Sequence, residues 1–309
     1  MSETPQNTPK NRQEEPQDIY FIDKTRVRAS FDRAAVNYDA SAILQKQVCE
    51  EMLSRLDLVK IKPQAILDLG CGTGHGSFSL QKRFSGAQII SLDIALGMLK
   101  QTKLGQPFFN RFFGKHHLLC ADIESLPIAN HSIGLVWSNL ALQWCNDLDA
   151  AFNEVTRVLQ PNGLFMFSTF GPDTLKELRH ATQASDDNPN QTHVSRFIDM
   201  HDIGDALTRA GFSAPVLDVE RYTLTYDNVI DVMRDLKSIG AHNATFGRAR
   251  GLQGREFLKN LAHHYEQFRS EGKLPATYEV VFGHAWKSTS THTNKDGVSP
   301  ITFIKKYKQ

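Results

Sequence analysis

The sequence is poor in the features that would mark a secreted or membrane protein. Its 309 residues include only four cysteines, and no two of these have the spacing of a metal-binding or redox motif. Isolated reduced thiols fit a reducing compartment. The first eighteen residues are polar and lack the apolar run of a signal peptide, and no stretch approaches the roughly 20 apolar residues of a membrane span. We therefore expect a cytoplasmic protein that does not enter a membrane.

A charge excess of one sign is also missing. The 35 basic and 34 acidic side chains give a formal charge of +1, so no overall field favours nucleic acid or a membrane surface. The histidine pairs at 116–117 and 263–264 lack metal-ligand spacing with other candidates, so no metal is expected. With 40% hydrophobic and 22% charged residues, the composition is that of a globular protein with an ordinary core.

What the sequence does contain is a regular alternation of strands and helices. It predicts an α/β fold with a doubly wound, mostly parallel sheet of seven strands. Strands are expected at residues 65–67, 88–92, 118–122, 133–139, 164–170, 216–226 and 277–286. A helix over 148–159 should be stopped by Pro161 and Gly163 before the fifth strand.

The ends of the chain and one internal segment depart from this alternation. Residues 1–18 are predicted to be a disordered arm, and 288–309 a flexible tail. The domain would then span 19–287, with helices and a loop over about 227–273 inserted before the last strand. Whether this insertion moves as a lid stays open.

A glycine-rich turn follows the first predicted strand. Residues 68–74 read Asp-Leu-Gly-Cys-Gly-Thr-Gly, and such glycines let the backbone adopt positive φ and approach a ligand closely. The ligand would be a dinucleotide or S-adenosylmethionine. A dinucleotide turn has the pattern G-x-G-x-x-G, whose third glycine would here fall on His75 or Ser77. Asp68, before the first glycine, suits a cationic amino-acid group better than a pyrophosphate.

Acidic residues follow the next two strands. Asp93 ends the second strand, where a carboxylate can accept both ribose hydroxyls, and Asp122 follows the third. These acids favour S-adenosylmethionine over a glycine turn without a ligand. For Asp122 a helix N-cap is the alternative, because aspartate is a favoured residue there.

The turn with its two acids resembles the class I methyltransferases over about residues 30–225. The resemblance implies S-adenosyl-L-methionine as cofactor and S-adenosyl-L-homocysteine as product. It implies that Asp68 lies in a methionine-side loop, that Asp93 binds the ribose, and that Asp122 and Ile123 flank the adenine. Carried over onto this sequence, the cofactor-binding positions are Asp68, Gly70, Gly72, Gly74, Asp93, Asp122, Ile123 and Asn139.

Segments outside the cofactor loop carry a closer resemblance. They are 31–35 (Phe-Asp-Arg-Ala-Ala) with Tyr38, 122–127 (Asp-Ile-Glu-Ser-Leu-Pro), 137–144 (Trp-Ser-Asn-Leu-Ala-Leu-Gln-Trp), 193–197 (His-Val-Ser-Arg-Phe), 236–241 (Leu-Lys-Ser-Ile-Gly-Ala) and 277–286 (Thr-Tyr-Glu-Val-Val-Phe-Gly-His-Ala-Trp). In this order, over about 24–287, they resemble the malonyl-acyl-carrier-protein O-methyltransferases of biotin synthesis (the BioC type). The resemblance implies that the free carboxylate of a malonyl thioester, on acyl carrier protein or on coenzyme A, is methylated to start pimeloyl formation.

The implied reaction needs no strong base, because a carboxylate with a pKa of about 4 is already ionised at neutral pH. An arginine fork would match the malonyl carboxylate, and we take Arg196 as the candidate. A structural or surface arginine is the alternative there. Tyr38 is the second catalytic candidate, expected to close over cofactor or substrate, with an aromatic core anchor as its alternative.

The implied partner, an acyl carrier protein, should be acidic. Five basic residues lie within 237–259 against the single acid Glu256, and we expect Lys237, Arg248 and Arg250 to contact the carrier. A solvated, mobile face is the alternative for this cluster.

Two other functions stay open. Residues 170–178 and 276–278 are also similar to a mitochondrial complex I assembly factor, a protein arginine hydroxylase of the same fold. The four acids in residues 1–18 are unlike a mitochondrial presequence, so we favour the carboxyl methyltransferase. A non-catalytic cofactor-binding assembly protein is the third possibility, and the intact set of Asp68, Asp93 and Asp122 argues against it.

Overall fold

The computed structural model describes residues 18–107, 114–186, 188, 191–248 and 254–288. The predicted arm and tail therefore lie outside the described residues, except for Asp18 and Ser288, and so does Arg250. Within these ranges, no helix has the length and apolar character needed to cross a membrane.

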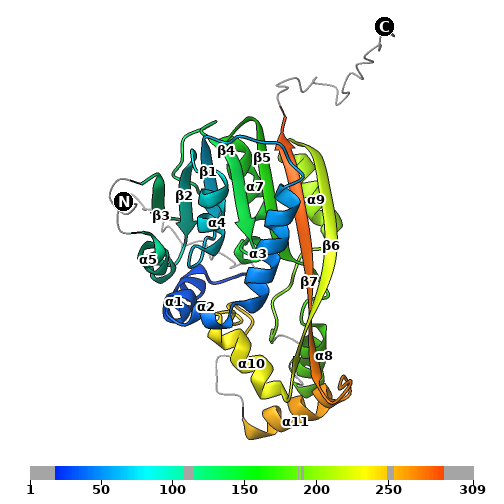
Figure 1. Cartoon of the computed structure of the whole chain (residues 1–309). Coiled ribbons are helices and arrows are strands. Elements are labelled where there is room, and N and C mark those ends of the chain that lie inside the picture. Colours follow the sequence, from blue (N-terminus) through cyan, green and yellow to red (C-terminus); the bar gives the residue numbers. More distant parts are fainter. Residues whose placement is uncertain (1–17, 108–113, 187, 189–190, 249–253, 289–309) are drawn as a thin grey trace, which may run out of the picture.

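A single seven-stranded sheet, in the order β3-β2-β1-β4-β5-β7-β6, forms the centre of the molecule (Figure 1). Its strands β1 to β5 are parallel, whereas β7 runs antiparallel to both of its neighbours. This arrangement confirms the predicted α/β fold. The strands are β1 (Ala65–Leu69), β2 (Gln88–Asp93), β3 (His116–Cys120), β4 (Ile133–Asn139), β5 (Leu159–Phe170), β6 (Phe212–Tyr226) and β7 (Leu274–Lys287).

Helices cover both faces of the sheet because successive residues of a buried strand point to opposite sides. Ile66 packs with α3 and α4 on one face, whereas its neighbour Leu67 packs with α7 and α9 on the other. The helices of the described chain are α1 (Lys24–Ala34), α2 (Tyr38–Ser41), α3 (Ile43–Leu56), α4 (His75–Arg83), α5 (Leu96–Gly105), α7 (Leu148–Val158), α8 (Lys176–Ser185), α9 (Met200–Arg209), α10 (Val229–Ser238) and α11 (Arg255–Glu266).

The two antiparallel strands extend well past the parallel ones. β6 and β7 have 15 and 14 residues, whereas β1 has 5, and the ladder between the two continues to Tyr226 opposite Leu274. Figure 1 shows α8, α10 and α11 around this projecting end, below α1 and α2. Tyr265 of α11 is fully buried there, and its hydroxyl donates a hydrogen bond to the Pro275 carbonyl at 2.9 Å. The insertion before β7 thus builds a second layer beside the carboxyl edge of the sheet.

Several predicted strand bounds are wrong: β1 continues to Leu69, and β6 and β7 begin at Phe212 and Leu274 rather than at residues 216 and 277. β5 begins at Leu159, directly after α7, so Pro161 and Gly163 lie inside the strand. The strand accommodates them because Asn162 adopts a φ of 60° and the pairing with β4 shifts register between Ile133 and Leu135. The third strand ends at Cys120, because Asp122 has left the ladder and forms a turn that bridges to Ser125.

Candidate functional site

The glycine turn has the geometry that the sequence pattern predicts. Gly70, Gly72 and Gly74 have φ values of 72°, 56° and 93°, in the left-handed region that favours glycine. A Cβ atom on Gly70 would lie 2.2 Å from the Ala141 Cβ, so any side chain is excluded there. The Gly70 amide donates to the Leu92 carbonyl at 2.8 Å, which attaches the turn to the end of β2.

Asp68 is the buried acid at the start of this turn. Its side chain is 2% exposed, and Oδ2 accepts a hydrogen bond from Ser77 Oγ at 2.5 Å. Ser77 Oγ is in turn within 2.5 Å of Ser91 Oγ, which is 2.6 Å from His116 Nε2. Burial raises the pKa of Asp68 to about 7, although the Ser77 hydrogen bond acts in the opposite direction. The hydrogen bond from Ser77 thus holds the carboxylate in one orientation. A cationic group of a ligand beside it would stabilise the ionised form, which burial disfavours.

Asp93 holds the other end of the turn. Its two oxygens accept hydrogen bonds from the amides of Gly72, at 2.9 Å, and Ala95, at 2.8 Å. Burial raises the pKa of Asp93 to about 6, while these backbone bonds lower it. The carboxylate is therefore oriented between the glycine turn and the start of α5 before any ligand arrives.

Two small cavities flank the turn along the carboxyl edge of the sheet. One of about 80 Å³ is lined by residues of α1 together with Asp93, Asp122 and Ile123. One of about 50 Å³ is lined by Asp68 and its neighbours, and Gly70, Gly72 and Asn139 contribute to both cavities. Of the eight expected cofactor positions, only Gly74 lines neither. The structure therefore brings seven of the eight predicted cofactor residues together around two adjoining cavities.

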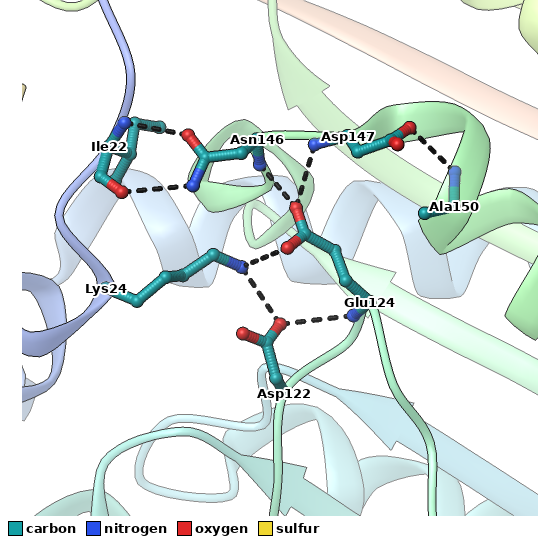
Figure 2. Close-up of polar contacts among 7 residues, drawn as sticks. All are labelled: Ile22, Lys24, Asp122, Glu124, Asn146, Asp147 and Ala150. Atoms are coloured by element: carbon teal, nitrogen blue, oxygen red, sulfur yellow. Dashed lines mark hydrogen bonds and ion pairs between the residues drawn. The ribbon is translucent and has the colours of Figure 1, made fainter. Parts of the chain in front are cut away.

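A residue that sequence analysis missed closes the larger of these two cavities. The Lys24 ammonium lies 2.9 Å from Asp122 Oδ1 and 3.0 Å from Glu124 Oε2 (Figure 2). Burial acts against the charge on Lys24, but the hydrogen bonds and charges of the two acids outweigh it and raise its pKa. No helix follows Asp122, whose Oδ1 instead accepts from the Glu124 amide at 3.1 Å. Lys24 and Asp122 are 98 residues apart, so no sequence spacing reveals the pair.

The same network holds the segment before α1 in place. The Asn146 side chain accepts from the Ile22 amide at 2.7 Å and donates to the Ile22 carbonyl at 3.0 Å. Glu124 Oε1 accepts from the amides of Asn146 and Asp147, as Figure 2 shows. Lys24 and Ile22 thereby join the N-terminal segment to the loops after β3 and β4, and α1 lies over the cavity as a cover.

A third cavity, of about 470 Å³, opens beside the turn and is large enough for an acceptor substrate. It shares Phe31, Tyr38, Leu140 and Trp144 with the 80 Å³ cavity. Most of its lining is apolar, and residues 235–243 of the insertion form part of its wall. Within the described lining there is no arginine or lysine; the side chains that can donate hydrogen bonds include Gln45, Gln143, His193, Ser195 and His242.

Tyr38 lies where the three cavities meet, because it contributes to the lining of each. It begins α2, and its ring is 3.9 Å from where a Cβ on Gly72 would lie. Burial of the phenol, followed by the negative charges of Asp93 and Asp39, raises the pKa of Tyr38. The hydroxyl therefore stays protonated at neutral pH and is available as a hydrogen-bond donor.

Arg196 lies apart from Tyr38. It is exposed and lines a neighbouring hollow of about 690 Å³, whereas the other four residues of the 193–197 segment line both this hollow and the acceptor cavity. His193 of the same segment does line the acceptor cavity. Its Nε2 is 2.8 Å from Asp186 Oδ2, and its ring stacks on Phe257 with centroids 5.3 Å apart.

The predicted carrier contacts also separate in space. Lys237 is exposed in the last turn of α10, whereas the Arg248 guanidinium donates to the Thr245 carbonyl at 3.0 Å. Burial, and after it the charges of Arg33 and Lys237, lowers the pKa of His242 in the wall of the acceptor cavity. Arg33, to which the sequence analysis gave no role, therefore lies close enough to His242, as Lys237 does, for its charge to act on that side chain.

Trp137 is a further residue that the sequence pattern did not single out. Its side chain is fully buried on β4 and lines the 50 Å³ cavity. The indole Nε1 has no hydrogen-bond partner within the described part of the protein. A buried donor of this kind fits the carboxylate of an amino-acid ligand, since burying it without an acceptor is costly. In the same part of the chain, no cluster of three His, Cys, Asp or Glu side chains is arranged to hold a metal ion.

Comparison with known proteins extends these observations over nearly the whole chain. Residues 67–167 match the methyltransferase domain family. The chain is 64% identical to the malonyl-[acyl-carrier protein] O-methyltransferase of Methylovorus sp. (strain MP688), over 93% of this chain and 96% of that protein. It is 53% identical to the enzyme of the same name from Gallionella capsiferriformans (strain ES-2), over 91% and 97% of the two chains. The YcgJ protein from Bacillus subtilis shares the fold, with a TM-score of 0.54, 15% identity and coverage of 78% and 99%.

Proposed function

This chain belongs to the malonyl-[acyl-carrier protein] O-methyltransferase family, and we propose that it methylates the free carboxylate of a malonyl thioester held by an acyl carrier protein. The products are the malonyl methyl ester, which starts pimeloyl formation in biotin synthesis, and S-adenosyl-L-homocysteine. One observation carries the proposal: an apolar acceptor cavity of about 470 Å³ adjoins the cavity at the glycine turn, with which it shares Phe31, Tyr38, Leu140 and Trp144. The arginine hydroxylase and the non-catalytic assembly factor are not favoured, because the relatives that cover almost the full chain are O-methyltransferases.

The buried acids match the parts of S-adenosyl-L-methionine, which supplies a methyl group on a positively charged sulfur. Asp68 pairs with the ammonium group, and the charge of that partner stabilises a carboxylate that burial disfavours. Asp93 accepts the ribose hydroxyls. Asp122 and Ile123 flank the adenine, and α1 covers it from the other side. The Trp137 N–H donates to the methionine carboxylate, which gives this buried donor its partner.

Methyl transfer to the acceptor carboxylate requires that the carboxylate be aligned with the methyl group and stripped of water, and it does not require a strong base. It is ionised at neutral pH, so the protein's contribution is to orient one oxygen toward the methyl group and to exclude water. The apolar lining, including Phe170 and Phe197, keeps water out. Tyr38 directs its protonated hydroxyl toward the acceptor at the junction of the cavities. We also retain Arg196 as a proposed carboxylate contact, which requires its side chain to reach from the neighbouring hollow into the acceptor cavity that the rest of the 193–197 segment lines.

The carrier protein delivers the thioester from outside the fold. Lys237, Arg248 and Arg250 are the proposed basic contacts, and a cytoplasmic location would place the reaction beside the fatty-acid enzymes that use the same carrier. The charge of the malonyl group is removed by methylation, so the product fits those enzymes better than the substrate does.

The direct test is incubation of the purified protein with methyl-labelled S-adenosylmethionine and malonyl-carrier protein. Label should enter a base-labile methyl ester on the carrier, and acetyl-carrier protein, which lacks the second carboxylate, should remain unlabelled. Tyr38→Phe removes only the hydroxyl, so it should lower kcat while binding S-adenosylhomocysteine nearly as well as the wild type. A protein that binds the cofactor but labels neither carrier would contradict the proposed function.

A further inference from the structure

An exposed surface of mixed basic and apolar character borders the acceptor cavity at the junction of α1, α2 and α10. We call it the rim surface, and it consists of Arg33, Val36, Ile43, Met233 and Lys237. Ile43 lines the cavity and is nevertheless 61% exposed, which places it at the mouth. Val36 and Met233 are 75% and 37% exposed, so the rim surface presents three apolar side chains to solvent. Figure 1 shows α10 next to α1 and α2 at this point.

The turn after α10 packs closely against α1, and α1 and α10 each carry one of the two cations of the rim surface. Gly240 follows α10 with a φ of 74°, and a Cβ on it would lie 3.1 Å from the Phe31 ring and 3.2 Å from the Ala34 Cβ. This close approach sets Arg33, at the end of α1, near Lys237, in the last turn of α10. The charges of both act on His242, whose side chain lines the cavity.

These two cations differ from Lys24, which also lies near the site, in their lack of a carboxylate partner within the described residues. Lys24 is neutralised by Asp122 and Glu124, whereas Arg33 and Lys237 form no ion pair or side-chain hydrogen bond with any residue that the structure describes. Met233 and Lys237 are four residues apart on α10 and therefore share one helix face. The rim surface thus combines exposed apolar side chains with two cations that form no ion pair within the described residues.

The dimensions of the cavity limit what can occupy this surface. About 470 Å³ accommodates a malonyl group and part of a flexible arm, but the folded body of a carrier must remain outside, against the mouth. An acidic protein with apolar contact residues matches the rim surface in charge and in character. We propose that the rim surface is the docking site of the acidic carrier protein, with Arg33 and Lys237 paired to its carboxylates; this rests on the proposed function.

Charge reversal tests this docking site directly. The variant R33E/K237E is assayed with malonyl-carrier protein and with the malonyl thioester of N-acetylcysteamine, which has no charged carrier portion. Malonyl-CoA is unsuitable because coenzyme A is itself anionic. We expect kcat/KM to fall roughly tenfold or more on the carrier substrate and to stay unchanged on the small thioester, because only the carrier is steered by charge. The wild-type rate on the carrier should also fall with added salt, and the variant should lose this dependence.

Lys60→Glu is the matched control. Lys60 is exposed just before β1, at the amino edge of the sheet and away from the cavity, so its reversal should leave both substrates unaffected. The milder variant R33A/K237A shows whether a loss of activity comes from misfolding. Its melting temperature and its affinity for S-adenosylhomocysteine should both equal those of the wild type. Three outcomes would overturn the docking site. They are full activity of either double variant on the carrier substrate, a loss of kcat/KM in Lys60→Glu as large as that in R33E/K237E, and a loss in R33E/K237E that is equal on both substrates. Absence of methylation of both substrates by the wild type would instead reject the proposed function.

Discussion

The buried carboxylate of Asp68 should make cofactor binding depend on pH near neutrality. We consider the substitution Asp68→Asn, which keeps an oxygen that can accept the Ser77 hydrogen bond but removes the charge. A hydrogen bond to a charged group contributes about 1.5–3 kcal/mol. If Asp68 pairs with the ammonium group, its loss should weaken S-adenosylhomocysteine binding roughly 10- to 150-fold at pH 8.

The sign of the pH dependence follows from the direction of the shift. Burial raises the pKa of Asp68 to about 7, so the free protein holds a proton there below neutral pH. Binding needs the ionised form, so wild-type affinity should level off above pH 7 and fall by up to about tenfold per unit below it. Asp93, whose pKa burial raises to about 6, adds a second transition at lower pH. Asp68→Asn should abolish the upper transition and retain the lower one.

Isothermal titration with S-adenosylhomocysteine between pH 5.5 and 8.5 measures both effects. Asp205→Asn, which removes an exposed carboxylate from α9, is the matched control and should behave as the wild type. Stability gives an independent check. Because the pKa of Asp68 is raised above its ordinary 3.8, the wild-type free energy of unfolding should fall as pH rises from 4 through 7, and Asp68→Asn should flatten that slope. If Asp68→Asn keeps wild-type affinity and an unchanged pH profile, the assignment of Asp68 to the ammonium group is refuted.

Four further substitutions test other parts of the site. Gly70→Ala would force a Cβ to within 2.2 Å of the Ala141 Cβ at a φ of 72°, so cofactor binding should be lost and the unfolding free energy should fall by about 1–3 kcal/mol; replacing Ala141 with glycine as well should recover part of that stability, and no recovery would argue against this contact. Lys24→Met leaves two carboxylates unpaired and loosens α1, so stopped-flow measurements should show S-adenosylhomocysteine dissociating roughly tenfold faster, and an unchanged rate would rule out α1 as a cover. Trp137→Phe removes the unpaired indole N–H and should weaken cofactor binding by roughly fivefold or more in titrations, whereas equal affinity would exclude this donor. Arg196→Ala should raise KM for the malonyl thioester far more than KM for the cofactor, and an unchanged substrate KM would remove this residue from the acceptor site.

The sequence predicted the order of strands and helices and the edge of the sheet at which the cofactor residues lie. Both depend on the pattern of neighbouring residues along the chain. Apolar runs marked the buried strands, and a glycine turn between strand and helix marked the ligand end of β1. Asp68 and Asp93 lie in the last two residues of β1 and β2, and Asp122 follows β3; the carboxyl ends of these neighbouring parallel strands meet at one edge of the sheet. The prediction failed where a strand takes up an irregular segment, as at Pro161 and Gly163 in β5, because side-chain pattern does not reveal a register shift.

Tertiary structure alone decided which distant side chains meet. The pairing of Lys24 with Asp122 and the approach of Arg33 to Lys237 join parts of the chain that no periodicity relates. The sequence also does not determine which hollow a side chain lines: Arg196 lines only the 690 Å³ hollow, whereas His193 lines both that hollow and the acceptor cavity. The sequence pattern indicates which face of a helix or strand is buried. Tertiary packing determines which residues of other elements contact that face. For this protein the local chemistry of the cofactor turn was encoded in a short motif, and the acceptor cavity with its charged mouth arises only when α1, α10 and the sheet are assembled.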